Sequence, residues 1–153
     1  MTAVLESSIK ERSCCFSGHR KLPSEQLEEI RKRLKAEVIS LINTGIRAFY
    51  CGLASGFDTE AAMTVNEIKA EYPNIKLIMV LPYRQEINIP YDECVCLAET
   101  YRKGCFHIRN RYLVEHSRHC ICYLTEDKGG TAYTVNYAFK KGLTVYNIAE
   151  KRV

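Results

Sequence analysis

The chain has 153 residues, of which 46% are hydrophobic and 26% are charged, and its formal net charge at neutral pH is +4. This length fits a single domain, residues 1–153, that is large enough to bury a hydrophobic core. The composition is typical of a soluble globular protein, and no apolar run approaches the roughly 20 residues that a membrane-spanning helix needs. Because residues 1–13 also lack a secretory signal pattern, we expect a cytoplasmic protein with no membrane partner.

The cysteines indicate buried thiols rather than a metal site or a disulfide framework. The close pairs Cys94/Cys96 and Cys120/Cys122 lack the C-x-x-C spacing of common zinc sites. Five cysteines lie in apolar stretches, where a free thiol behaves as a small hydrophobe: Cys14, Cys15, Cys51, Cys120 and Cys122. We therefore predict no metal, no cofactor and a reducing compartment.

The first half of the chain alternates strands and helices. Residues 13–17 are a short apolar strand. Ser24 is the expected N-cap of a helix whose apolar residues recur at helical spacing until Gly45. Residues 47–51 form the second strand, and a second helix is expected at residues 58–72, where a proline stops it.

The second half continues this pattern around a less regular segment. Residues 76–82 form a buried strand. Residues 91–102 fit a helix, and residues 107–117 show the helical pattern more clearly. The remaining predicted elements are a strand at 120–124, a helix at 131–141 and a strand at 143–148.

Short strands that alternate with longer helices predict an α/β fold. We expect a three-layer, Rossmann-like, doubly wound sheet of about five mostly parallel strands with helices on both faces. Ligands of open α/β sheets bind outside the carboxyl ends of the strands, near the point where the strand order reverses. The loops at those ends are residues 17–23, 52–58, 82–86 and 125–131. The glycine-rich and cationic loops that could hold an anion are therefore expected on one rim.

The loop before the helix at 131–141 contains Gly129, Gly130 and Thr131 in succession. A helix that begins there offers unpaired backbone N–H groups and the positive end of its dipole, and the two glycines let a phosphate approach the backbone. The hydroxyl of Thr131 can bind a phosphate oxygen or cap the helix. A phosphate cradle and a plain turn with a threonine cap both remain open.

A second loop, residues 52–62, also joins a strand to a helix. Gly52 and Gly56 flank a turn of small residues. Asp58 is most simply an N-cap, and Asp58 or Glu60 alternatively holds a ribose hydroxyl.

A third loop, SGHR, contains Gly18, which frees the backbone, and His19 and Arg20, which supply donors. We interpret His19 as a donor that orients the ligand, and a general base remains the alternative.

The segment from Arg102 to His119 is rich in basic side chains. It either forms a solvated helix face or binds single-stranded nucleic acid, with Tyr101 and Tyr112 available to stack bases. The basic residues of this segment are Arg102, Lys103, His107, Arg109, Arg111, His116, Arg118 and His119.

Three stretches together resemble the signatures of the SLOG (DprA/Smf–LOG) superfamily of Rossmann-like proteins. They are GLASGFDTEAA (52–62), RNRYLVEHSRHCICYL (109–124) and KGGTAYTVNYAFKKGLTVYNI (128–148). The resemblance spans residues 15–148, and the most similar branch is the YpsA-like branch of bacterial proteins. DprA proteins carry a similar glycine loop, Arg-Asn-Arg segment and Thr-Ala loop in the same order.

The resemblance implies a nucleotide-sized pocket. Gly52, Ser55, Gly56 and Asp58 would form one wall, and the loop from Gly129 to Thr131 would hold the phosphate. Arg109, Asn110 or Arg111 would line the side. Arg109 also resembles an arginine of the LOG branch, whose enzymes cleave the base from a nucleoside monophosphate.

The chain departs from the LOG pattern after the glycines. Lys128 replaces a proline, and no glutamate follows Thr131 within the next residues, so the evident catalytic acid is missing. Asp58 or Glu60 would have to replace it. DNA binding as in DprA also loses support, because the flanking domains of DprA have no counterpart here and the net charge is modest.

Three functions therefore stay open. The first is binding of a nucleotide or nucleotide-derived ligand at the rim of the sheet, with a sensor as one such role. The second is a LOG-like nucleoside-monophosphate phosphoribohydrolase, and the third is single-stranded DNA binding. Apolar helices on both faces also leave room for a homodimer.

Overall fold

The computed structural model describes residues 9–150. Residues 1–8 and 151–153 lie outside this range, and with them most of the segment on which the signal-peptide prediction rests. That residues 1–153 form one domain therefore stays a prediction. No helix within residues 9–150 is long and apolar enough to cross a membrane.

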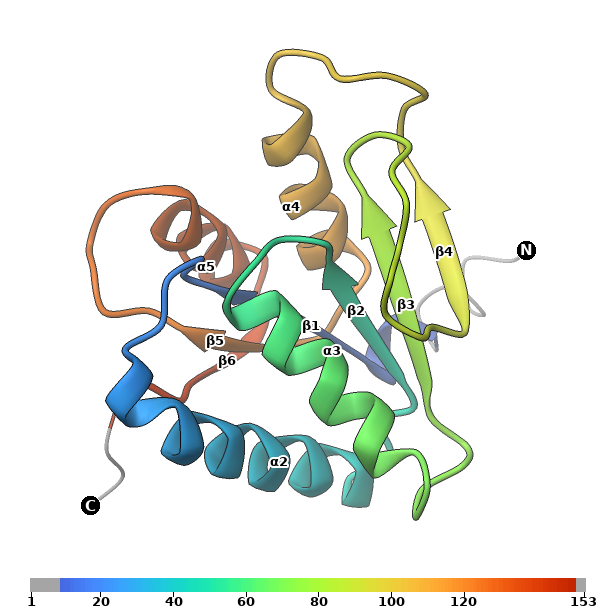
Figure 1. The fold of residues 1–153 in the computed structure, drawn as a ribbon, viewed down its shortest axis with the longest axis vertical. Helices are drawn as coiled ribbons and strands as arrows, with labels where there is room; N and C mark the ends of the chain where they lie inside the picture. Colours follow the sequence, from blue (N-terminus) through green and yellow to red (C-terminus); the bar gives the residue numbers. More distant parts are fainter. Residues whose placement is uncertain (1–8, 151–153) are drawn as a thin grey trace.

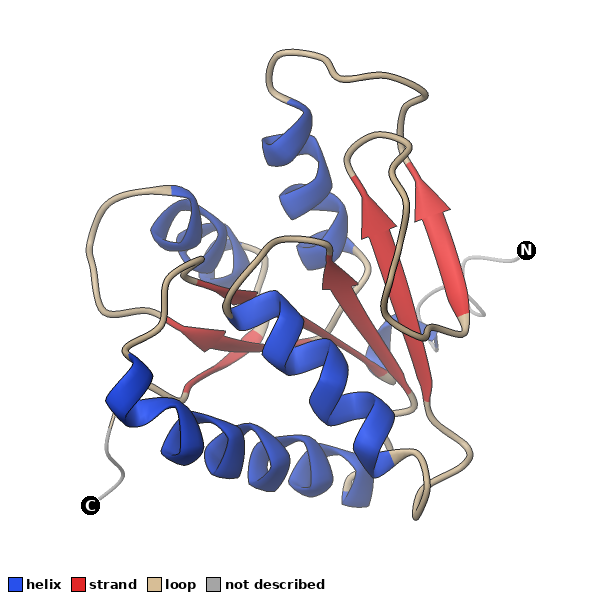
Figure 2. Ribbon diagram, viewed as in Figure 1, coloured by secondary structure: helices blue, strands red, loops and turns tan. Residues whose placement is uncertain are grey.

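The centre of the structure is a single parallel sheet (Figures 1 and 2). Its strands are β1 (Ser13–Gly18), β2 (Ala48–Gly52), β3 (Lys76–Leu81), β4 (Glu93–Cys96), β5 (His119–Tyr123) and β6 (Thr144–Asn147). They lie in the order β4-β3-β2-β1-β5-β6, and every neighbouring pair is parallel. The strand order reverses between β1 and β5. The predicted α/β, doubly wound fold is confirmed, with six strands among the described residues instead of five.

Helices cover both faces of the sheet. The helical elements are η1 (Ser24–Gln26), α2 (Leu27–Asn43), α3 (Phe57–Ile68), α4 (Cys105–Glu115) and α5 (Gly130–Lys140). Side chains alternate along each strand, so Phe16 of β1 packs in the core with α2 and α3, whereas Cys15 packs on the other face with α4 and α5. Because both faces are covered, strands β1, β2, β3 and β5 are nearly continuous apolar runs, which explains why their positions were readable from the sequence.

The buried-thiol prediction is confirmed. The five cysteines of the apolar stretches are free and fully buried, at 0% exposure. Within residues 9–150, no group of His, Cys, Asp and Glu side chains is arranged to hold a metal ion.

Two local predictions were wrong. Residues 91–102 contain strand β4 instead of a helix. Asp92 fixes the start of this strand, because its carboxylate accepts a hydrogen bond from the backbone of Leu77 and pairs with Lys69. Ser24 does not cap a helix: it begins the short helix η1, and α2 follows with Gln26 as its N-cap.

Candidate functional site

A cavity of about 410 Å³ opens at the carboxyl ends of β1 and β5, where the strand order reverses. This is the place that the topology rule for α/β sheets predicts. The predicted site residues that line it are Gly18, His19, Arg20, Asp58, Arg109, Asn110, Gly129, Gly130 and Thr131. Residues from the loops after β1, β2 and β5 and from helix α4 thus meet around one space. Gly52, Ser55 and Gly56 were also predicted, and they do not line the cavity.

The N-terminus of α5 forms one wall. The helix begins at Gly130 with Gly129 as its N-cap, and the first bond of the helix runs from the N–H of Tyr133 to the carbonyl of Gly129, at 3.0 Å. The N–H groups of the residues between them therefore have no acceptor within the helix. Thr131 makes no capping hydrogen bond, so the alternative of a threonine-capped turn does not describe this loop.

The two glycines of this loop leave the approach to the helix open. A Cβ atom added at Gly129 or at Gly130 would meet no atom within 4 Å. Gly129 has a φ of +97°, which other residues rarely adopt, whereas Gly130 has an ordinary helical backbone. The first turn also contains no acidic side chain. An anion could therefore reach the positive end of the helix dipole.

Arg109 and Asp58 are buried charges in the opposite wall. Arg109 of α4 is 5% exposed, and Asp58 of α3 is 8% exposed. Nε of Arg109 donates a hydrogen bond to Oδ1 of Asn110 at 2.8 Å, and no residue within 9–150 accepts one from its terminal nitrogens. Burial raises the pKa of Asp58 to about 7, although the guanidinium of Arg109 opposes this rise. The Asp58 carboxyl is therefore only partly ionised near neutral pH.

Asp58 does not cap α3, contrary to the simplest prediction. The N-cap is Gly56, and Asp58 lies within the first turn, where its Oδ2 accepts a hydrogen bond from the N–H of Ala54 at 3.3 Å. Gly52 lies directly behind it: a Cβ atom there would be 2.5 Å from Nη1 of Arg109 and 2.9 Å from Oδ2 of Asp58. Gly52 thus makes room for the two charged groups without lining the cavity itself.

His19 is held by a backbone group. Its Nε2 accepts a hydrogen bond from the N–H of Thr125 at 2.9 Å, so in the neutral ring the proton is on Nδ1. This arrangement suits a ligand donor at Nδ1 and leaves Nε2 occupied. Arg20, the next residue, is exposed at the mouth of the cavity.

Two glycines let the loops after β1 and β2 pack against each other. A Cβ atom at Gly18 would lie 2.3 Å from the ring of Phe57. Gly56 has a φ of +75°, and its Cβ atom would lie 2.2 Å from the carbonyl oxygen of Arg20. Ser55 is exposed beside them. These residues contribute to the site by setting the shape of the loops. The sequence motif does not reveal this role.

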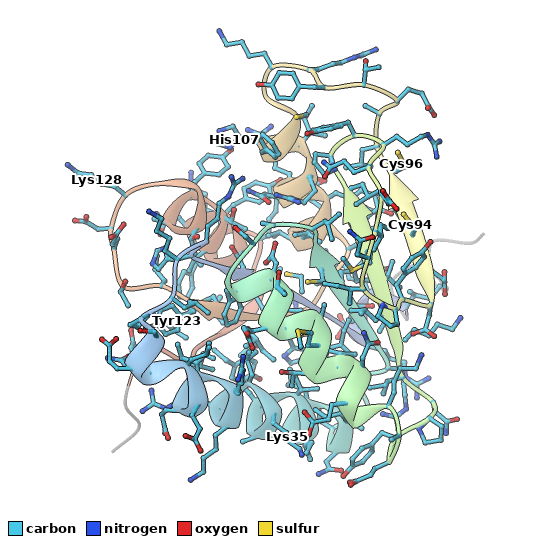
Figure 3. The ribbon with its side chains drawn as sticks, viewed as in Figure 1. Lys35, Cys94, Cys96, His107, Tyr123 and Lys128 are labelled. Atoms are coloured by element: carbon cyan, nitrogen blue, oxygen red, sulfur yellow. The ribbon has the colours of Figure 1, made fainter. Side chains whose placement is uncertain are left out.

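Sequence reasoning missed part of the lining. Phe106 and His107 come from the first turn of α4, and Glu126 and Lys128 come from the loop before α5. Figure 3 shows Lys128 projecting outward from this loop and His107 near the start of α4. The two loop residues belong to a predicted rim segment and His107 belongs to the predicted basic segment, but Phe106 carries no motif that would have marked it.

Comparisons with known proteins find relatives of this chain. The family model YpsA, described as the YspA SLOG family, matches residues 18–93. The UPF0398 protein of Bacillus thuringiensis (strain Al Hakam) is 28% identical over 133 residues, which cover 76% of this chain and 72% of the relative. The chain belongs to the YpsA-like branch of the SLOG superfamily. A UPF0398 protein of Bacillus cereus (strain ATCC 14579) is equally similar.

Solved structures share the fold of this SLOG domain. DNA processing protein A (DprA) of Streptococcus pneumoniae superposes with a TM-score of 0.62 at 20% identity, over 90% of this chain and 50% of that one. The SLOG domain thus spans half the length of that protein. DprA of Helicobacter pylori gives a TM-score of 0.59 at 16% identity, over 94% and 67% of the two chains. The structural genomics target TM1055 gives a TM-score of 0.63 at 19% identity, over 88% of this chain and 72% of that one.

The basic segment of the SLOG domain does not form one patch. Arg109 is buried in the cavity, and Arg111 donates hydrogen bonds to the hydroxyl of Tyr133 at 2.7 and 3.1 Å. Arg118 and His119 follow α4, near the amino end of β5, whereas Arg102 and Lys103 precede it. The segment therefore extends from the cavity rim to the opposite end of the sheet.

Glu60 lies outside the cavity of the SLOG domain. Its carboxylate accepts two hydrogen bonds from Arg31 of α2, at 2.7 and 3.0 Å. This pairing joins α2 to α3, and it commits Glu60 to the packing of the two helices.

Proposed function

We propose that this SLOG domain binds a nucleotide or nucleotide-derived molecule in the cavity, with a phosphate at the N-terminus of α5. Arg109 carries the proposal. A buried guanidinium costs free energy unless it is paired, and the nearby carboxyl of Asp58 has a pKa near 7 and does not fully neutralise it. An anion in the cavity would supply the missing partner.

The surrounding groups support a phosphate in particular. The open glycines at the start of α5 would let its oxygens reach the backbone N–H groups, and Lys128 lies beside them. His19 and Arg20 supply further donors across the cavity. A volume of about 410 Å³ falls within the range of small-molecule sites, about 300–1,000 Å³. We further propose that the protein senses this ligand.

The variant Gly130→Asp tests the phosphate position. An acidic residue in the first turn stabilises a helix by about 0.3–1 kcal/mol, so folding should be unchanged or slightly improved. The same carboxylate would repel a phosphate and occupy its place. Calorimetric titration with nucleoside monophosphates should therefore give binding to the native chain and none to this variant.

The control Asn136→Asp makes the same change in charge on the exposed side of α5. It should bind like the native chain. If Gly130→Asp retains full affinity, the phosphate does not bind at α5 and the proposal is wrong.

A LOG-like phosphoribohydrolase is a second candidate because Asp58 lines the cavity and has a pKa near 7, which suits a general acid. Incubation with nucleoside monophosphates would then release free base, and Asp58→Asn would stop the release. Binding without release of base would leave ligand binding as the function and exclude this reaction for the nucleotides tested.

Single-stranded DNA binding is the third candidate, because DprA of Helicobacter pylori, which shares this fold, binds single-stranded DNA. Exposed aromatic rings at Tyr101 and Phe106 would suit it. The arrangement of the basic residues argues against it, since Arg109 is buried and Arg111 is hydrogen-bonded to Tyr133. Fluorescence anisotropy with a labelled oligonucleotide should show no affinity that weakens steeply with salt.

A further inference from the structure

Three aromatic rings form a cluster at the mouth of the cavity. Tyr83 follows β3, Tyr101 belongs to the loop before α4, and Phe106 lies in the first turn of α4. The ring centroids are 5.8 Å apart for Tyr83 and Tyr101, 6.4 Å for Tyr83 and Phe106, and 6.2 Å for Tyr101 and Phe106. The cluster joins two segments that are distant in the sequence, and no motif predicted it.

Phe106 connects this cluster to the cavity. It is the member of the cluster that lines the cavity, and it is 36% exposed, while Tyr101 is 61% exposed. The guanidinium carbons of Arg20 and Arg109 lie 5.5 and 5.9 Å from the centroid of the Phe106 ring. Both distances lie within the range of a cation–π interaction, about 6 Å, so both guanidiniums interact with the ring, and a base that stacks on it would replace the exposed Arg20.

The ring and the phosphate position belong to two neighbouring helices. The ring of His107, next to Phe106, lies 4.9 Å from the ring of Tyr133 in the first turn of α5. Arg109, one helical turn beyond Phe106, contributes its buried guanidinium to the same cavity. An apolar aromatic surface and a helix end that is open to an anion therefore flank one space.

We propose that the aromatic base of the ligand stacks on Phe106, which Tyr83 and Tyr101 support from behind. This inference rests on the proposed function and narrows it: the site selects a molecule that carries both a phosphate and a base, and it discriminates against sugar phosphates and inorganic phosphate. Stacking of a base on an aromatic side chain changes affinity by about 5- to 150-fold.

The chain contains no tryptophan, so the variant Phe106→Trp places a single fluorescent reporter at the proposed platform. Titration with adenosine, guanosine, cytidine and uridine monophosphates should quench its emission through stacking for at least one of them. Ribose 5-phosphate and inorganic phosphate, which lack a base, should not quench it. Equal responses to a nucleotide and to ribose 5-phosphate would overturn the proposal.

Calorimetry with Phe106→Leu measures the contribution of the ring. Leucine keeps an apolar side chain at this partly exposed position, so the fold should be retained, which a thermal melt checks. Affinity for the nucleotide should fall about tenfold or more, and affinity for ribose 5-phosphate should stay the same. The matched control is Phe139→Leu on α5, where the side chain is 62% exposed and lies outside the cavity lining.

The two proposals fail in different ways. One outcome is that the nucleotide and ribose 5-phosphate bind the native chain equally, that Phe106→Leu changes neither affinity, and that Gly130→Asp abolishes both. In that case the base platform is wrong and the phosphate site stands. If neither ligand binds the native chain, the proposed function fails and the base platform fails with it.

Discussion

The Asp58 carboxyl makes stability depend on pH. Its pKa is near 7 in the folded chain because it is buried, whereas in the unfolded chain it has the ordinary value of about 3.9. The folded state therefore binds the proton more tightly than the unfolded state does. The stabilisation that this proton gives the folded chain is fully present below about pH 4. It is lost as the pH rises through about 7.

The variant Asp58→Asn should remove this dependence. Between pH 4.5 and pH 8, the native chain should lose about a few kcal/mol of unfolding free energy relative to the variant. This order of magnitude follows from the raised pKa of Asp58. Urea unfolding at a series of pH values measures it, and Asp127→Asn, which removes an exposed carboxyl, is the control. A difference that is constant with pH would contradict the buried environment of Asp58.

Glycines show what a sequence reveals about single residues and what it does not. The motifs marked Gly52, Gly56 and Gly130 as members of one site. Only the three-dimensional neighbours separate their roles: Gly52 clears space for Arg109 and Asp58, Gly56 fits against the backbone of Arg20, and Gly130 leaves open space above a helix end. These neighbours come from other loops, so the local sequence could not distinguish a glycine that serves packing from one that leaves a helix end open.

At the scale of elements, α2 and α3 are joined by ion pairs that face away from the cavity. Glu60 pairs with Arg31, and Glu67 pairs with Lys35. Glu60→Gln should therefore leave ligand affinity and any release of base unchanged, with only a small loss of stability because the pair is near the surface. Calorimetry and urea unfolding test both parts. A loss of binding in this variant, with the fold retained, would show that Glu60 acts in the site.

The elements that could be predicted are those whose pattern is set by burial. Strands β1, β2, β3 and β5 are buried on both faces and read as apolar runs. Strand β4 was missed because it has four residues at the edge of the sheet, all exposed or half-buried, and contacts with Lys69 and Leu77 define its start. Phe106 was missed for a similar reason, since its neighbours Tyr83 and Arg20 come from distant segments.

At the scale of the whole molecule, the packing of the sheet protects most thiols. Cys94 is exposed and Cys96 is half-buried, and the other cysteines are buried. Partial desolvation of its thiol and the neighbouring Cys96 raise the pKa of Cys94, which lowers its reactivity. A thiol reagent such as DTNB should therefore react with Cys94 first, then slowly with Cys96, and with the remaining thiols only after denaturation. The variant Cys94→Ser should lose the first phase, whereas rapid reaction of Cys15 or Cys120 would contradict the packed sheet.

The central claim is that a phosphate-bearing nucleotide binds where the strand order reverses, against the N-terminus of α5. Titration of ¹⁵N-labelled protein with a nucleoside monophosphate, followed by NMR of the backbone amides, tests it most directly. We predict that the amide signals of Gly129, Gly130 and Thr131 shift most, together with the side-chain signal of Arg109. Saturating nucleotide that leaves these signals in place, or that shifts only residues of α2 and α3, would contradict the claim.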